Sequence, residues 1–183
     1  MAALSNVPGR FQVLTSPTDD VRVVVDYAHT DDALKNLLDT ARPLTAGRVI
    51  TVFGCGGDRE RTKRPLMGAV AARLSDLVIV TSDNPRSEDP VRIIEDIKRG
   101  IVMPADRAPK GQPLPASTPF LAIVDRQAAI MKAVQEARTG DLVLIAGKGH
   151  EKTQVIGERT LPFDDVDVAR KALERRRAGT RVS

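Results

Sequence analysis

The chain has 183 residues, of which 42% are apolar and 28% charged, and its formal net charge is +4. These values predict one globular domain with a real core, and no apolar stretch approaches the roughly 20 residues that cross a membrane. A single cysteine excludes an internal disulfide and favours a reducing compartment, so we expect a cytoplasmic protein, while the lack of Trp argues against nucleic-acid binding by base stacking.

Short apolar runs rich in β-branched residues recur along the chain and predict strands. We expect these strands over residues 11–15, 21–25, 49–53, 77–80, 120–124 and 142–146, with an edge strand over 153–156. The segment 103–119 breaks this rhythm with five prolines. We interpret it as a surface excursion within the domain and not as a linker between domains, because the chain is expected to form a single domain.

Amphipathic stretches between the strands predict helices. The first has a stripe formed by Leu34, Leu37, Leu38 and Ala41 and stops at Pro43; the second begins near Pro65 with the stripe Leu66, Ala69, Val70 and Leu74. Further helices are expected over 90–99, with Gly100 beyond the end, over 127–138, closed by Gly140, and from the capping pair Asp164 and Asp165 to about residue 177. This alternation predicts an α/β domain whose mostly parallel sheet has helices on both faces.

Charged side chains follow almost every predicted parallel strand. The loops carry Asp26 and His29; Asp58 and Arg59; Asp83, Asn84 and Arg86; Asp125 and Arg126; and Lys148, His150 and Glu151. Right-handed crossovers bring the carboxyl ends of parallel strands to one edge, where ligands bind. We therefore expect a cleft with charges of both signs, which suits a small zwitterion such as an amino acid.

The segment 83–86, Asp-Asn-Pro-Arg, is the most informative of these loops. Pro85 fixes its own φ and restricts Asn84, so the loop is stiff. An arginine on such a loop is well placed to bind a carboxylate or phosphate through two parallel hydrogen bonds. The alternative is a surface turn with a solvated arginine.

Two glycine-containing loops do not fit known nucleotide motifs. The segment 54–57 lacks the G-x-G-x-x-G spacing, and in 147–151 His150 stands where a phosphate loop has Ser or Thr. There Glu151 would face a ligand ammonium and Lys148 would lie near an anion. No metal-ligand set is evident, and Cys55 is more typical of a buried thiol than of a nucleophile.

Five ordered motifs together resemble the C-terminal domain of the Mur ligases, in particular those that add diaminopimelate. The motifs are Asp26-Tyr27-Ala28-His29-Thr30, the stretch 52–59 (Val-Phe-Gly-Cys-Gly-Gly-Asp-Arg), the stretch 63–68 (Lys-Arg-Pro-Leu-Met-Gly), Asp83-Asn84-Pro85-Arg86 and Gly147-Lys148-Gly149-His150-Glu151. The resemblance covers nearly the whole chain, residues 1–183, as one domain, and implies a three-layer Rossmann-like fold.

The resemblance also implies a function. Mur ligases of this kind use ATP and Mg²⁺ to phosphorylate the D-glutamate carboxylate of a UDP-muramoyl dipeptide, and the amine of meso-2,6-diaminopimelate attacks the acyl phosphate. The amino-acid pocket would comprise Arg59, Asp83, Asn84, Pro85, Arg86, Gly147 and Glu151, with Arg86 on the distal carboxylate that lysine lacks. Asp26 and His29 would meet ATP.

One departure from the family pattern changes only the entry into a helix, and a larger one limits what we expect of this chain. Residues 29–32 read His-Thr-Asp-Asp where the family usually has His-Thr-Pro-Asp, and no phosphate loop for ATP and Mg²⁺ is present. We expect the chain to fold but not to ligate, with no catalytic residue of its own. The alternatives are a stand-alone module that binds a charged metabolite and the lysine-adding relative, which Arg86 disfavours.

Overall fold

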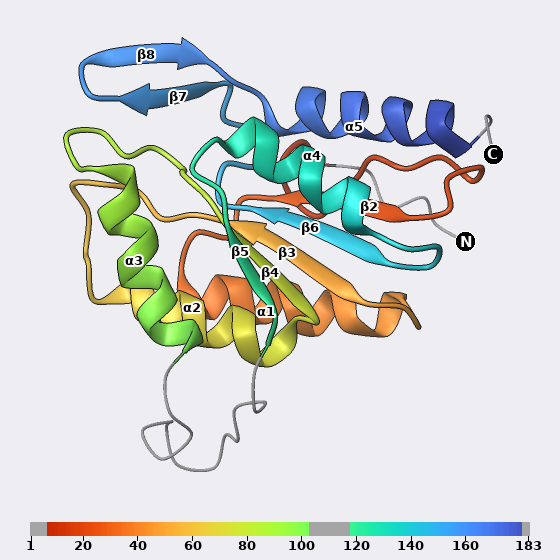
Figure 1. The fold of residues 1–183 in the computed structure, drawn as a ribbon, viewed down its shortest axis with the longest axis horizontal. Helices are drawn as coiled ribbons and strands as arrows, with labels where there is room; N and C mark the ends of the chain where they lie inside the picture. Colours follow the sequence, from red (N-terminus) through yellow and green to blue (C-terminus); the bar gives the residue numbers. More distant parts are fainter. Residues whose placement is uncertain (1–6, 103–117, 181–183) are drawn as a thin grey trace.

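A computed structural model, which describes residues 7–102 and 118–180, has a six-stranded sheet with helices on both faces (Figure 1). The strand order is β1-β2-β6-β3-β4-β5, in which β1 is antiparallel to β2 and the other pairs are parallel. The strands are β1 (Gln12–Val13), β2 (Arg22–Asp26), β3 (Val49–Phe53), β4 (Leu77–Val80), β5 (Phe120–Ala122) and β6 (Leu142–Ala146). The predicted three-layer α/β fold is confirmed.

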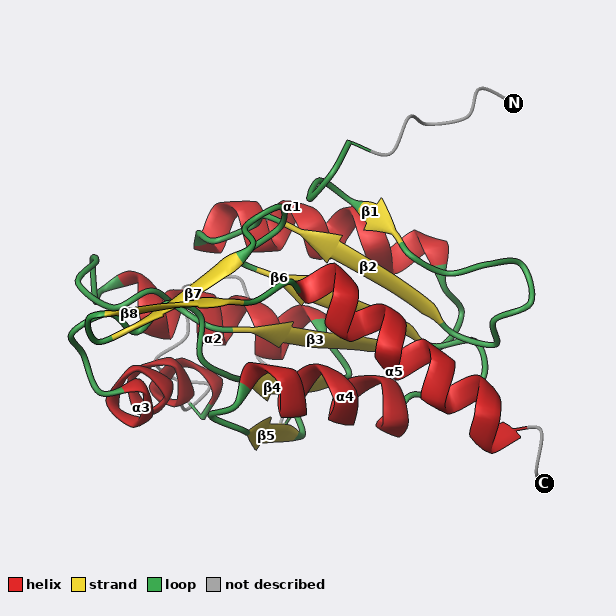
Figure 2. Ribbon diagram, turned by 90° about the horizontal axis from the view of Figure 1, so that it is seen from above, coloured by secondary structure: helices red, strands yellow, loops and turns green. Residues whose placement is uncertain are grey.

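The helices divide between the two faces of the sheet (Figure 2). One face is covered by α1 (Asp31–Ala41), α2 (Lys63–Leu74) and α3 (Pro90–Ile101), and the other by α4 (Arg126–Glu136) and α5 (Asp165–Thr180). Side chains cap two helix starts, since the Asp89 and Asp125 carboxylates accept hydrogen bonds from backbone N–H groups of the first turns of α3 and α4. The α1 stripe is confirmed, and Pro43 lies in a short 3₁₀ turn that ends the helix.

The burial of the two central strands explains their nearly continuous apolar sequences. Every residue of β3 and of β6 is buried, because each strand has a helical layer on both faces. Two separate apolar clusters result, one on each side of the sheet. The carboxyl ends of β2, β6, β3 and β4 consequently meet along one edge.

The predicted strand at 153–156 is confirmed, but it does not form an edge of the main sheet. It forms β7 (Thr153–Ile156), which pairs with β8 (Arg159–Pro162) as a separate hairpin. Its turn uses Gly157 at φ +58°, a conformation that glycine adopts without a side-chain clash. The hairpin extends past the end of the main sheet (Figure 1), and one isolated parallel bridge joins Ile156 to Arg86.

The predicted buried stripe of α2 is correct only in part, since Val70 and Leu74 pack against the core but are not the most buried residues of the helix. The residues buried on this helix are Arg64, Met67, Gly68, Ala71 and Ala72, whereas Leu66 is 47% exposed. The reason is the close packing of α3, which requires small residues at the contact. A Cβ atom added to Gly68 would lie 2.2 Å from the Ile97 carbonyl oxygen.

Gly100 was expected beyond the end of α3 and instead lies inside the helix. It serves the same helix contact, since an added Cβ would lie 1.8 Å from the Pro65 carbonyl oxygen. Two smaller corrections concern neighbouring elements: β5 ends at Ala122, and Arg126, expected in a loop, is the first residue of α4.

Gly100→Ala is therefore expected to lower the free energy of unfolding by about 1–3 kcal/mol, because α2 and α3 must separate to admit the methyl group. Urea unfolding followed by circular dichroism measures this change. The matched control is Gly179→Ala in α5, where no atom lies within 4 Å of the added Cβ. That variant should gain up to about 1 kcal/mol from helix propensity, and equal losses in both variants would contradict the packing argument.

The proline-rich excursion predicted at 103–119 falls, for residues 103–117, outside the described residues and stays a prediction. Thr118 and Pro119 are described and lead into β5. Among the described helices, none is both long and apolar enough to span a membrane.

Candidate functional site

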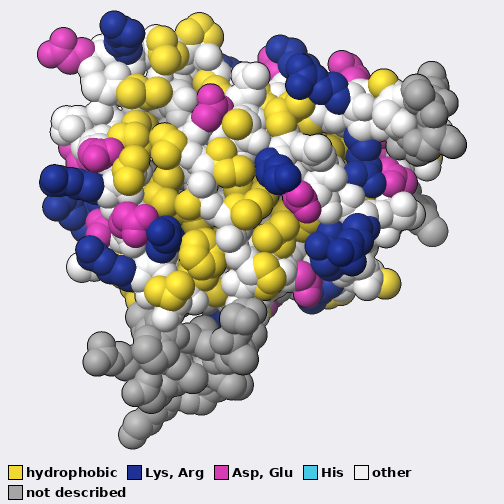
Figure 3. All heavy atoms as spheres, in the orientation of Figure 1, with side chains coloured by type: hydrophobic (Ala, Val, Ile, Leu, Met, Phe, Trp, Pro, Cys, Tyr) yellow, Lys and Arg dark blue, Asp and Glu magenta, His cyan; other side chains and the backbone are white. Residues whose placement is uncertain are grey.

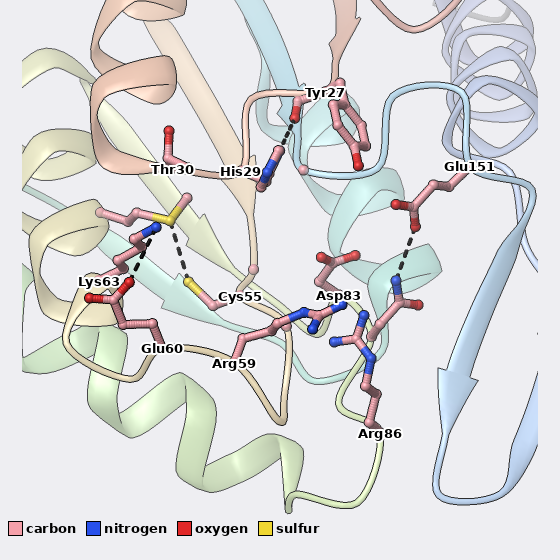
Figure 4. A pocket seen from close by; sticks show the side chains of 15 residues that line it. Tyr27, His29, Thr30, Cys55, Arg59, Glu60, Lys63, Asp83, Arg86 and Glu151 are labelled. Carbon is pink, nitrogen blue, oxygen red and sulfur yellow. Dashed lines mark hydrogen bonds and ion pairs between the residues drawn. The ribbon is translucent and has the colours of Figure 1, made fainter.

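A pocket of about 460 Å³ lies where the loops after β2, β3, β4 and β6 meet (Figure 4). The strand order explains this convergence, because β6 enters the sheet between β2 and β3. Seven of the nine predicted site residues line the pocket: His29, Arg59, Asp83, Asn84, Arg86, Gly147 and Glu151. A volume of this size is typical of small-molecule sites.

The other two predicted residues lie elsewhere. Pro85 is buried within the loop after β4, and its carbonyl oxygen accepts a hydrogen bond from the Glu88 N–H at 3.0 Å. Asp26 lines an adjoining hollow, and its two oxygens accept hydrogen bonds from the Phe11 and Ala28 N–H groups, each at 2.7 Å. The structure therefore gives Pro85 a role in shaping the loop, and contact of Asp26 with ATP stays a prediction.

Asn84 holds the pocket together through its side-chain amide. The Oδ1 atom accepts hydrogen bonds from the Lys148 ammonium at 3.0 Å and from the Val155 N–H at 2.9 Å. The Nδ2 atom then donates to the Glu151 carboxylate at 3.0 Å. Because two donors fix the oxygen, the orientation of the amide is determined, and Asn84 links the loops after β4 and β6 to the hairpin.

Arg86 has a backbone conformation that the sequence did not reveal. Its φ is +53°, in the left-handed region that non-glycine residues seldom adopt and that costs about 1 kcal/mol or more. The hairpin holds it there: the Arg86 N–H donates to the Val155 carbonyl at 3.1 Å, and the Gly157 N–H donates to the Arg86 carbonyl at 2.7 Å.

This backbone directs the Arg86 side chain toward Asp83 and Arg59, as Figure 4 shows. Nη1 donates to the Gly57 carbonyl oxygen at 2.7 Å, whereas Nε and Nη2 make no hydrogen bond to any residue that the structure describes. Arg59 likewise has no hydrogen-bond or ion-pair partner among residues 7–102 and 118–180. The pocket thus presents two guanidinium groups with donors available for an anion.

Two acidic groups, Asp83 and Glu151, also line the pocket. The Asp83 and Glu151 side chains are 12% and 34% exposed. Each uses one oxygen on Lys148, at 3.3 Å and 3.2 Å. Lys148 itself is fully buried, and its ammonium donates to these two carboxylates and to Asn84. The expectation that Lys148 lies near a ligand anion is therefore wrong.

Arg126, which we expected among the ligand-facing loops, lies in the interior. Its guanidinium forms two hydrogen bonds with the Asp165 carboxylate, at 2.8 Å and 2.7 Å, and both side chains are completely buried. Further bonds reach the Ala146 carbonyl at 2.9 Å and the Ser82 carbonyl at 3.4 Å. The pair therefore joins the ends of β4 and β6 directly beneath the pocket.

A second buried arginine, Arg64, supports the glycine-containing loop after β3. It makes a two-point bond to Glu88, at 3.0 Å and 2.8 Å, and Glu88 also accepts the Asp58 N–H at 2.7 Å. The Arg64 hydrogen bonds lower the pKa of Glu88 from 4.5 to about 2. No sequence pattern linked these two residues, which are 24 positions apart.

The Glu88 pKa predicts a specific acid sensitivity. Since its folded pKa lies below its unfolded value, Glu88 stabilises the fold above about pH 4.5, and this contribution is lost as the pH falls toward 2. Glu88→Gln should cost roughly 2 kcal/mol at pH 7, and the difference from the parent should shrink over that window. Urea unfolding at a series of pH values measures it; a difference that is independent of pH would refute the assignment.

The single thiol is not a reactive group in this structure. Burial raises the pKa of Cys55 to about 12, and its Sγ atom packs 3.6 Å from the Met67 sulfur. Both described histidine rings flank Tyr27, with His29 at 4.7 Å and His150 at 5.4 Å between ring centroids. In the part of the chain that the structure describes, no three His, Cys, Asp or Glu residues are grouped so as to hold a metal.

Comparison with known proteins identifies the domain. Residues 9–149 match the Mur ligase family, glutamate ligase domain. The UDP-N-acetylmuramoyl-L-alanyl-D-glutamate–2,6-diaminopimelate ligase of Gloeobacter violaceus is 49% identical over 178 residues, which are 97% of this chain and 34% of that protein. The ligase of the same name from Synechocystis is 53% identical over 168 residues, 91% of this chain and 31% of the relative.

Solved structures of Mur ligases have the same fold as this chain. A structure of UDP-N-acetylmuramoyl-L-alanyl-D-glutamate–2,6-diaminopimelate ligase superposes with a TM-score of 0.80 at 43% identity, over 93% of this chain and 32% of that one. The UDP-N-acetylmuramate-alanine ligase of Thermotoga maritima, at 18% identity and a TM-score of 0.56 over 94% of this chain and 31% of that chain, shares the fold. The chain spans about a third of the length of these relatives. On this evidence, the chain belongs to the Mur ligase family, in which it corresponds to the glutamate ligase domain.

Proposed function

We propose that this domain recognises the amino acid that a Mur ligase adds to its nucleotide-linked substrate, and that this amino acid is meso-2,6-diaminopimelate. Relatives that are about 50% identical over nearly the whole chain carry that substrate in their names. In the proposed reaction, ATP phosphorylates the D-glutamate carboxylate of the UDP-muramoyl dipeptide. The amine of diaminopimelate then displaces the phosphate.

The observation that carries the proposal is that the pocket holds free donors and free acceptors together. Arg86 offers unpaired N–H donors, and Asp83 and Glu151 each keep one carboxylate oxygen without a partner among the described residues. A diamino diacid has two carboxylates and two amines, so it can satisfy both kinds of group at once. Lysine has only one carboxylate and would leave one guanidinium without its anion.

ATP and Mg²⁺ would be bound mainly by parts that the relatives have beyond the aligned third. From this domain we propose that His29, which lines the mouth of the pocket, and Asp26, in the adjoining hollow, lie on the side that meets ATP. We assign no magnesium ligand to the described residues. Because the reaction consumes ATP, we place it in the cytoplasm.

The test is phosphate release by a full-length ligase that carries this domain, measured with diaminopimelate, lysine or glutamate as the acceptor. Release that depends on diaminopimelate is the expected result. Comparable use of lysine would overturn the substrate assignment. The 183-residue chain alone, given ATP and both substrates, should release none; turnover by it would show that the phosphate-binding machinery is not needed.

A further inference from the structure

Lys148 is fully buried beneath the pocket, although it belongs to a loop at the ligand-binding edge of the sheet. Its ammonium group has three N–H donors and finds three acceptors: Asn84 Oδ1 at 3.0 Å, Glu151 Oε2 at 3.2 Å and Asp83 Oδ1 at 3.3 Å. No donor is left over. Lys148 therefore cannot bind a ligand directly, and whatever it does for the site it does through these three side chains.

The acceptors of Lys148 are themselves part of the pocket lining. The Lys148 ammonium donates to one oxygen of Asp83 and one of Glu151, which leaves the second oxygen of each carboxylate without a hydrogen bond to any described residue. The Glu151 oxygen that Lys148 binds, Oε2, also accepts a hydrogen bond from Asn84 Nδ2 at 3.0 Å. The lysine thus decides which atoms of the two acids face a ligand.

Two glycines on either side of Lys148 give the backbone the conformation that turns this side chain inward. Gly147 and Gly149 have φ values of +118° and +53°, which other residues rarely adopt. A Cβ at Gly149 would lie 2.7 Å from both the Gly9 carbonyl oxygen and the Tyr27 Cβ. Close packing on the outer side therefore leaves room only for glycine, and the loop turns the lysine back under the pocket.

The charges around Lys148 show why the position needs a cation. Asp83 and Glu151 are brought to within hydrogen-bond reach of one atom, and the nearest buried guanidinium, Arg126, has its own carboxylate in Asp165. Without the ammonium, two carboxylates would face each other across a buried space. Each would turn toward solvent or toward the other's hydrogen-bond partners.

From this geometry we propose that Lys148 is a positioning residue for amino-acid recognition, which sets the free carboxylate oxygens of Asp83 and Glu151, directly and through Asn84, to receive the ammonium groups of the amino acid. This inference rests on the proposed function and deepens it. It separates the pocket into residues that touch the ligand and one residue, beneath them, that orients two of these. The phosphoryl-transfer step does not involve Lys148.

The test is steady-state kinetics of Lys148→Met in a full-length ligase that carries this domain, with diaminopimelate and ATP varied separately. We expect the KM for diaminopimelate to rise about 100-fold, the typical loss when one member of a buried charge cluster is removed, while the KM for ATP is unchanged. The matched control is Lys152→Met, since Lys152 is a 61% exposed lysine that pairs with Asp164 outside the pocket. This control should leave both KM values unchanged.

A double-mutant cycle with Glu151→Gln separates orientation from general stability. If Lys148 acts through Glu151, the double variant should lose much less affinity than the product of the two single losses, and it should also unfold less readily than Lys148→Met because an uncompensated carboxylate is gone. Where Lys148→Met alone does not fold, the double variant is compared with Glu151→Gln, and the added rise in the KM for diaminopimelate should stay well below 100-fold.

Three outcomes would overturn the proposal: additive losses, an unchanged KM for diaminopimelate, or equal rises in both KM values. A parent enzyme that ignores diaminopimelate would instead refute the proposed function. The two failures are therefore distinguishable by the parent enzyme alone.

Discussion

Arg86→Ala is expected to lower kcat/KM for diaminopimelate by ~100- to 1,000-fold in a full-length ligase that carries this domain, and to leave the KM for ATP unchanged. The range follows from removing one member of a desolvated charge pair, which typically costs about 3–4 kcal/mol, with ~1.4 kcal/mol for each factor of ten. The preference for diaminopimelate over lysine should fall by a similar factor, because the guanidinium is the group that lysine leaves unpaired. Competition between the two amino acids measures this ratio directly.

Two further variants make the Arg86 experiment specific. Arg86→Lys keeps the charge but loses the two-point geometry, so it should recover only part of the activity. Arg92→Ala, at an exposed position on α3, is the matched control and should behave as the parent does. If Arg86→Ala discriminates against lysine as well as the parent does, our role for Arg86 is wrong.

Asp165→Ala is expected to be the most destabilising single change, at about 3–5 kcal/mol, since it leaves the Arg126 guanidinium buried without a counter-charge. The loss should appear as a lower urea midpoint for the isolated chain. The matched control is Asp39→Ala, which removes the exposed pair with Lys35 and should cost no more than about 0.5 kcal/mol.

The combined variant Arg126→Met with Asp165→Leu tests the cause of this effect. Replacing both charges by apolar side chains removes the desolvation penalty of the pair together with its attraction. The double variant should therefore be more stable than Asp165→Ala. A double variant that is less stable than either single change would show that the hydrogen bonds to the Ala146 and Ser82 carbonyls matter more than the charge.

The sequence was sufficient to predict the elements whose burial pattern is simple. The strands β3, β4 and β6 have the predicted bounds, because a strand covered on both faces is a nearly continuous apolar run that turn residues end abruptly. The most buried residues of α2 and the position of Gly100 were not predicted, for a different reason. Close helix contacts favour small residues, and a hydrophobicity pattern does not register a glycine that packs.

The sequence by itself determined which chemical groups gather at the edge of the sheet, since strand order along the chain and right-handed crossovers bring the loops together. It determined that Asp83, Asn84 and Arg86 come from one stiff loop. Only the tertiary structure decided how these groups are used. Contacts between residues far apart in the sequence turn Lys148 inward, hold Arg86 at positive φ through the hairpin and pair Arg126 with Asp165. Such contacts depend on the packing of distant segments, so no local pattern of residues specifies them.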